Sequence, residues 1–227
     1  MKKRTIAASL LLPLAAACST IRYPLPGELS GVAPMPVSGR QGVLVRQHLS
    51  FGPYATGEVR RSATRGTEQR DRLDSHAADV VQRYAFSLDR AGAKVAEVEC
   101  TAEGRAASTL GVTWESRRAL HCAVTPTDGE RHTLQLESSR DRPLAGQVVG
   151  PAGYRVAGSD RAGGGRVTGT AGYTLSRIGG PAVAAVDVMN EGAVVLATPA
   201  DDVVAAVAAA LLLYQDPLQA SERFRDP

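Results

Sequence analysis

The sequence lacks the short motifs that mark common enzymes and metal proteins. It has no Gly-x-Ser-x-Gly, no His-Glu-x-x-His and no Cys-x-x-Cys, the patterns of a hydrolase nucleophile, a zinc peptidase and a redox dithiol. Its glycine-rich stretch at 163–165 is not followed by the Gly-Lys-Ser/Thr that completes a phosphate loop. We therefore predict no catalytic constellation, no metal site and no cofactor.

The amino end has the three zones of a bacterial export signal. Lys2, Lys3 and Arg4 form a basic region, residues 6–14 are mostly apolar, and residues 15–17 are alanines, an order typical of a signal peptide. The apolar stretch is shorter than the about 20 residues that a membrane-spanning helix needs. We predict a signal peptide over residues 1–17.

The segment that ends at Cys18 resembles the lipobox of bacterial lipoproteins, in which small residues precede a cysteine that receives the lipid. Family members carry leucine three positions before that cysteine, whereas here Ala15 stands there and Leu14 lies one step further away. The alanines also suit an ordinary signal peptidase, which would leave a free thiol at Cys18. The resemblance implies lipidation of Cys18, and Ser19 implies sorting to the outer membrane, with the domain facing the periplasm.

The cysteine count supports lipid attachment. The chain has three cysteines, Cys18, Cys100 and Cys122, and an odd number in an exported protein leaves one thiol unexplained. Lipidation of Cys18 leaves a pair. Because Cys100 and Cys122 lie in two strand-like segments of an exported chain, we predict a structural disulfide between them. It would close a loop of about 20 residues and contribute roughly 3 kcal/mol in the chain-entropy model.

The positive charge of the chain belongs to its targeting segment. The full sequence has 26 basic and 23 acidic residues, and removal of Lys2, Lys3 and Arg4 leaves 23 of each. A nucleic-acid-binding domain would keep a basic excess on one face. We therefore expect no nucleic-acid partner.

Proline and glycine are frequent between Ile21 and Arg40. Proline removes backbone donors and favours extended geometry. This composition predicts that residues 18–40 form a lipidated, proline-rich tether; a proline-rich ligand for a partner domain is the alternative interpretation.

Residues 41–215 are predicted to form a single β-rich domain, followed by a polar tail at 216–227. Apolar and polar residues alternate at several places, most clearly over residues 96–103, which is the pattern of a half-buried strand. Turn residues such as Asp128 and Gly129 separate the segments. We predict a mainly β fold, an antiparallel sheet that forms a sandwich or a closed barrel.

The last element, at about 199–214, is predicted to be an apolar helix. Thr198 can cap it, Pro199 suits its first position and Asp201 complements its dipole. Residues 203–213 are eleven consecutive apolar residues, so the helix has no polar face and must be buried on all sides. Its length of roughly 24 Å is short of a bilayer.

This helix after a series of strands resembles the tubby and LURP-one barrels, in which a hydrophobic C-terminal helix threads a closed antiparallel sheet. The resemblance implies a scaffold that binds phospholipid head groups or has another binding role, and it transfers no site residue. A helix packed on one face of an open sheet is the alternative.

We predict a binding or structural module that is anchored in the membrane through its lipid and binds an envelope protein or lipid. One alternative is a cell-envelope hydrolase built from Ser75, His76 or His121; another is a carrier of an apolar ligand inside the barrel. The histidines are interpreted as ordinary surface or core residues, although His121 and His132 are expected on paired strands near Cys122. Five arginines form the densest basic cluster, which acidic residues interleave, so a solvated face is expected: Arg60, Arg61, Arg65, Arg70 and Arg72.

Overall fold

The computed structural model describes residues 23–39, 48–62, 65–70, 75–109, 112–139 and 142–215, with the backbone alone at 65–70, 75–78, 106–109, 112–116 and 139. One short 3-10 helix, η1 (Gly27–Leu29), and one α-helix, α1 (Asp202–Tyr214), accompany the strands. The strands are β1 (Met35–Ser38), β2 (Ser50–Phe51), β3 (Tyr54–Thr56), β4 (Arg60–Arg61), β5 (Arg65–Arg70), β6 (Ser75–Arg90), β7 (Ala93–Thr109), β8 (Val112–Pro126), β9 (His132–Ser139), β10 (Ala145–Val149), β11 (Tyr154–Ser159), β12 (Arg161–Ala162), β13 (Gly165–Arg166), β14 (Gly172–Arg177), β15 (Ala182–Asp187) and β16 (Ala193–Leu196).

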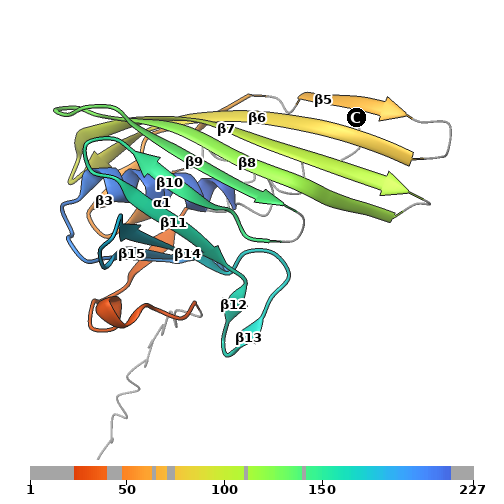
Figure 1. Ribbon diagram of the computed structural model, residues 1–227. Helices are drawn as coiled ribbons and strands as arrows, with labels where there is room; N and C mark the ends of the chain where they lie inside the picture. The colour runs from red at the N-terminus through yellow and green to blue at the C-terminus, as the bar shows by residue number, and fades with distance from the viewer. Residues whose placement is uncertain are drawn as a thin grey trace, which may run out of the picture.

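Twelve antiparallel strands form a closed barrel (Figure 1). The order around the wall is β3-β2-β1-β16-β15-β14-β11-β10-β9-β8-β7-β6, and β3 pairs again with β6, where Tyr54 lies opposite Arg90. This pairing joins the two ends of the sheet. The mainly β fold with a C-terminal helix is therefore confirmed, and of the architectures that the sequence left open the closed barrel is the one that forms.

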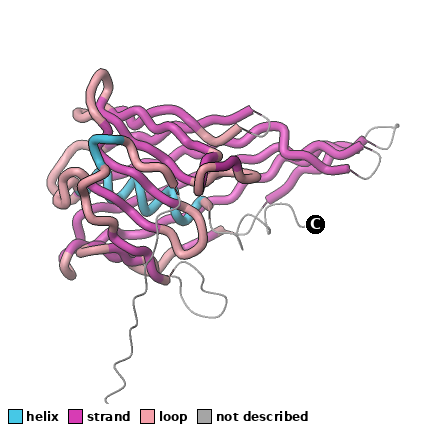
Figure 2. The backbone as a smooth tube through the Cα atoms, turned by 90° about the horizontal axis from the view of Figure 1, so that it is seen from below, coloured by secondary structure: helices cyan, strands magenta, loops and turns pink. Residues whose placement is uncertain are grey.

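Helix α1 runs through the interior of the barrel (Figures 1 and 2). It contacts β7 and β8 on one wall and β15 and β16 on the wall opposite. All side chains from Val204 to Tyr214 are buried, as a helix without a polar face requires. Many of them are alanines, and their small side chains let the strands surround the helix closely.

The helix begins later than predicted. Asp201, and not Thr198, is the N-cap: its carboxylate accepts a hydrogen bond from the backbone amide of Val204 at 3.1 Å. This bond satisfies one of the amides that the first turn leaves without an intrahelical partner. Residues 198–200 form the turn that leads into the helix.

Residues 23–38 do not form the predicted tether but lie against the barrel. Strand β1 is part of the wall, paired with β16 and β2, and Leu29 is fully buried in a second apolar cluster on the outer side of β15. Tyr23 is buried too; its hydroxyl lies 2.6 Å from that of Thr174, and its amide donates to Asp187 at 3.3 Å. The prolines of this segment cannot donate a backbone hydrogen bond to a neighbouring strand, but they do not prevent the side chains of Tyr23 and Leu29 from being buried.

Gly172 is required for this packing. A Cβ atom at this position would lie 2.6 Å from Cγ of Tyr23 and 2.6 Å from the carbonyl oxygen of Val186. The absence of a side chain on β14 therefore leaves the space in which the ring of Tyr23 lies.

The three longest strands continue beyond the barrel (Figures 1 and 2). Strand β9 pairs with β8 only as far as Arg117, while β6, β7 and β8 go on pairing with one another to Ser75, Thr109 and Val112. Strand β5 adds a fourth strand along β6. We call this four-stranded extension, formed by β5 and by residues 75–81, 103–109 and 112–117, the blade.

Substitution of Gly172 by valine is expected to detach Tyr23 and the segment that follows it. The larger side chain overlaps the tyrosine ring, so cleavage at Leu29 by chymotrypsin should become faster. Tyr23→Ala, which removes the same contact without crowding β14, should have the same effect. Gly27→Ala is the matched control, because no atom lies within 4 Å of the added Cβ. Unchanged cleavage in both Gly172→Val and Tyr23→Ala would contradict this packing.

Candidate binding surface

The two cysteines that were predicted to pair lie side by side on β7 and β8. Cys100 is directly opposite Cys122 in the register, their Cα atoms are 4.1 Å apart, and their sulfur atoms are at the bonding distance of 2.09 Å. Both side chains are buried in the main core, below 5% exposure. A buried bond in the middle of two paired strands has a structural role, because no substrate thiol can reach it. Cys18 lies outside the described residues.

The candidates for a hydrolase are not brought together. His76 pairs with Ser108 on β7, whereas His121 pairs with Thr101, seven residues away, which is roughly 23 Å along a strand. Ser75 is next to His76 at the tip of the blade, and only its backbone is described. A nucleophile and its base must lie within hydrogen-bond reach, so neither Ser75 nor His76 can form a site with His121.

His121 and His132 lie on the paired strands β8 and β9, as predicted, but not opposite each other. His121 faces Gln135 in the register and His132 faces Val124. Within the described ranges no group of three or more metal-ligating side chains is gathered.

The interior of the barrel is occupied by the chain itself. The main core consists of inward-facing strand residues and the side chains of α1, most of them with no exposed surface. An apolar ligand would have to displace the helix, so the carrier alternative has no structural support. In the described part of the chain no helix is long and apolar enough to cross a bilayer.

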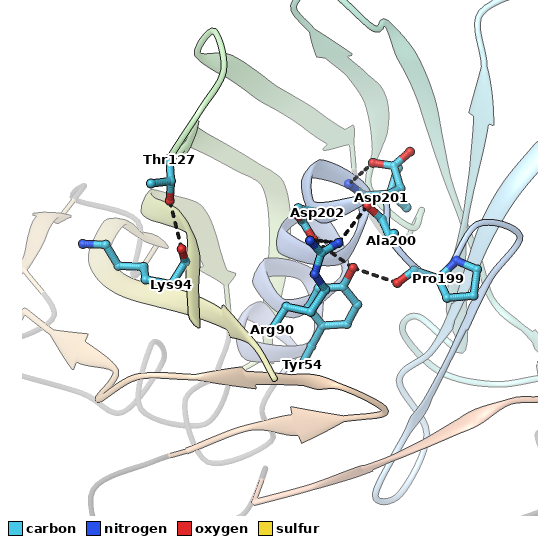
Figure 3. Close-up of polar contacts among 9 residues, drawn as sticks. Tyr54, Arg90, Lys94, Thr127, Pro199, Ala200, Asp201 and Asp202 are labelled. Atoms are coloured by element: carbon cyan, nitrogen blue, oxygen red, sulfur yellow. Dashed lines mark hydrogen bonds and ion pairs between the residues drawn. The ribbon is translucent and has the colours of Figure 1, made fainter. Parts of the chain in front are cut away.

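A polar cluster holds the amino end of α1 at one opening of the barrel (Figure 3). The single hydroxyl proton of Tyr54 is shared between two acceptors, the carbonyl oxygen of Pro199 at 2.9 Å and Oδ1 of Asp202 at 3.0 Å. Arg90 forms an ion pair with Asp202 at 3.1 Å, and Tyr154 donates to Asp201 at 3.1 Å. Each bond joins the barrel wall to the start of the helix, so the cluster has a structural function.

The tyrosines of this cluster resist ionisation. Burial, followed by the charge and the hydrogen bond of Asp201, raises the pKa of Tyr154 to about 12. Burial and then Asp202 raise the pKa of Tyr54 well above its ordinary value. Burial also raises the pKa of Tyr173 in the wall. These hydroxyls remain neutral hydrogen-bond donors at neutral pH and are unsuited to act as bases.

Arg61 and Tyr84 bind the carboxyl end of the helix. Tyr84 donates to the carbonyl of Ala210 at 2.9 Å, and Arg61 donates to the carbonyl of Leu213 at 3.3 Å while its guanidinium lies 5.1 Å from the centre of the Tyr84 ring. A cation at this end complements the helix dipole. The expectation of a solvated face is therefore wrong for Arg61, although Arg60 beside it is exposed.

Sequence reasoning missed the role of Arg61 because its partners are distant along the chain. The side chains of Arg65 and Arg70 are not described, and Arg72 lies outside the described residues. Whether these three arginines form a solvated face therefore stays a prediction.

The blade contributes neither to the main core of the barrel nor to the enclosure of α1. Past Arg117 none of the described strands pairs with β8 on the side away from β7. Such an edge presents unpaired backbone amides and carbonyls. The blade also carries Trp114, the single tryptophan of the chain. Its open edge makes the blade the candidate binding surface.

In three comparisons with known proteins, no family model, no curated protein and no solved structure matches this chain.

Cys122→Ser is expected to lower the melting temperature under non-reducing conditions, by an amount that corresponds to roughly 3 kcal/mol of lost chain constraint. Cys100→Ser is the matched variant and should have the same effect. In the presence of a reductant that opens the buried bond, all three proteins should melt together. Identical melting of the wild type with and without reductant would contradict a stabilising disulfide.

The loss of stability at alkaline pH is expected to result from ionisation of the buried tyrosines in the unfolded state. Below about pH 10 the phenols are neutral in both states, whereas between about pH 10 and about pH 12 the unfolded chain loses protons that the folded chain keeps, so stability falls as pH rises. Tyr154→Phe removes one such group and should make this decline shallower, at the cost of a hydrogen bond at neutral pH. Urea midpoints across this range measure the slope; a slope equal to that of the wild type would refute the role of Tyr154.

Proposed function

We propose that this protein is a lipoprotein of the outer membrane, anchored through Cys18 and facing the periplasm, whose barrel holds out the blade to bind another envelope protein. The observation that carries this proposal is the blade itself: three strands continue beyond a barrel that is filled by its own helix, and β5 adds a fourth strand to them. A filled barrel supplies rigidity, and binding is left to the surface.

The composition of the blade supports a partner-binding role. Its strands consist mostly of small, polar and charged residues, with few large apolar side chains. A sheet of this kind has no hydrophobic face of its own with which to form an independent core. Its strands stay folded because they continue from the barrel wall. Since the blade adds no core of its own, its retention is best explained by a binding role of the exposed strands.

The position of the blade supports it as well. Tyr23, five residues after Cys18, lies on β14 and β15 through its hydrogen bonds to Thr174 and Asp187. The blade grows from β6, β7 and β8, on the opposite side of the ring of strands. An anchor on one wall leaves the other wall, and the blade with it, turned toward the periplasm.

The chemistry that suits the open edge of β8 is a strand of another protein. An extended peptide pairs its backbone with the exposed amides and carbonyls of an edge strand, and alternate side chains provide specificity. The hydrolase and carrier alternatives lack such support, since His121 is separated from Ser75 and His76 and the interior of the barrel is filled.

Photo-crosslinking in intact envelopes tests the partner. A crosslinking residue at Thr113 of β8 is expected to capture one discrete envelope protein, while one at the exposed Arg155 on β11 should not capture it. With the purified partner, the emission of Trp114 should shift, because this single tryptophan reports on the blade. Equal capture from both positions, or recovery of this chain alone, would count against a binding role for the blade.

The anchor has its own test in mass spectrometry of the mature amino terminus. We expect an N-terminal Cys18 that carries acyl chains, and Cys18→Ser should release the protein from the membrane fraction. An unmodified Cys18 would reduce the protein to a secreted one.

A further inference from the structure

The packing of Tyr23 fixes where the lipid anchor can lie relative to the barrel. Tyr23 is buried, hydrogen-bonded to β14 and β15, and set over Gly172. Only five residue steps separate it from Cys18, and an extended chain covers at most about 3.6 Å per step. The two Cα atoms are therefore within about 18 Å of each other, whereas a tether to residue 40 would allow several times that distance.

The surface beside Tyr23 includes the β12–β13 hairpin. Ala162 of this hairpin and Val167 just after it pack against the outer cluster to which Tyr23 and Leu29 belong. Figure 1 shows the hairpin standing out from the barrel on the side where the N-terminal segment lies. This hairpin is therefore on the part of the surface that a membrane holding Cys18 can reach.

The hairpin has the chemistry of a surface that meets phosphates. Arg161 and Arg166 lie opposite each other in its two-stranded ladder, and the side chain of Arg166 is 79% exposed. Asp160 is the single acid among residues 160–166, and it forms an ion pair with Arg166, in which Asp160 accepts hydrogen bonds from Nε at 2.7 Å and from Nη2. With two arginines and one acid the segment keeps one excess positive charge, and Nη1 of Arg166 and the guanidinium of Arg161 are left to bind phosphate. Guanidinium groups bind phosphate oxygens through two parallel hydrogen bonds.

The tip of the hairpin allows a close approach. Gly163 and Gly164 have φ of +56° and +85°, and no atom lies within 4 Å of where their Cβ atoms would be. No side chain shields the backbone of this turn, so a flat surface such as a membrane can approach it closely. Arg161 and Arg166 lie in the ladder next to the turn.

We propose that the β12–β13 hairpin is the membrane-contacting face of the anchored protein, with Arg161 and Arg166 binding phospholipid phosphates. This inference rests on the proposed attachment of the lipid at Cys18. It orients the whole molecule: the β14–β15 wall is next to the bilayer, and the blade lies on the far side.

The experiment uses Cys18 as a chemical anchor. Because Cys100 and Cys122 are bonded to each other, the mature chain that begins at Cys18 has one free thiol. This thiol is coupled to maleimide head groups in vesicles of phosphatidylethanolamine and phosphatidylglycerol, and hydrogen exchange is measured by mass spectrometry on coupled and free protein. Amides of residues 160–167 should exchange more slowly in the coupled protein, while those of the β8–β9 turn at 127–131 should not change.

A double variant tests the arginines. Arg161→Gln with Arg166→Gln should lose the protection of residues 160–167 although the protein remains coupled. Arg131→Gln with Arg155→Gln removes two exposed arginines elsewhere and should keep it. Equal exchange of residues 160–167 in coupled and free protein, or protection that survives the first double variant, would overturn the proposal.

The outcome is separable from that of the proposed function. Maleimide coupling bypasses lipidation in the cell, so an unmodified Cys18 in cells would overturn the anchoring but not the hairpin contact. Conversely, a lipidated Cys18 together with an unprotected hairpin would leave the anchor in place and remove this inference alone.

Discussion

The rest of the structure depends on the enclosure of α1. A helix with eleven consecutive apolar residues cannot lie on a surface, because contact of any of its sides with water raises the free energy of the folded state. Contact with β7 and β8 on one side and β15 and β16 on the other satisfies this requirement. Twelve strands are enough to surround it, and its alanines keep it narrow. The helix is thus the core of the barrel and explains why no interior space remains for a ligand.

Apolar contacts alone do not hold an apolar helix in one position, because they are not directional. Hydrogen bonds from tyrosines of the wall supply that direction. Tyr54 and Tyr154 bind its start, and Tyr84 binds the carbonyl of Ala210 near its end. Gln215, just after the helix, donates to Tyr173 in the wall at 2.6 Å. Each tyrosine places its ring in the apolar core, and its hydroxyl bonds to a backbone carbonyl, a carboxylate or, at Tyr173, the side-chain amide of Gln215. These bonds fix both the depth and the rotation of the helix.

Because the interior is filled, binding must take place on the outer surface of the molecule. We propose a different role for each of two opposite parts of that surface. The wall of β14 and β15 holds the N-terminal segment and the hairpin of Arg161 and Arg166, and we assign it to the membrane. The blade grows from the opposite wall, and we assign it to a protein partner. A rigid barrel between the two surfaces would keep the edge of β8 at a fixed orientation to the bilayer, which a flexible tether of twenty residues would not.

The sequence by itself determined the local features: the buried helix, the alternating strands, and the pair of Cys100 and Cys122. These follow from patterns within a few residues, since period 2 and an unbroken apolar run report burial directly. Only the tertiary structure decided that β3 closes the ring with β6, that Tyr23 and Leu29 lie on the barrel despite their prolines, and that Arg61 binds the helix end instead of solvent. These depend on contacts between residues distant in the chain, and alternation states which face of a strand is buried but not which strand lies beside it.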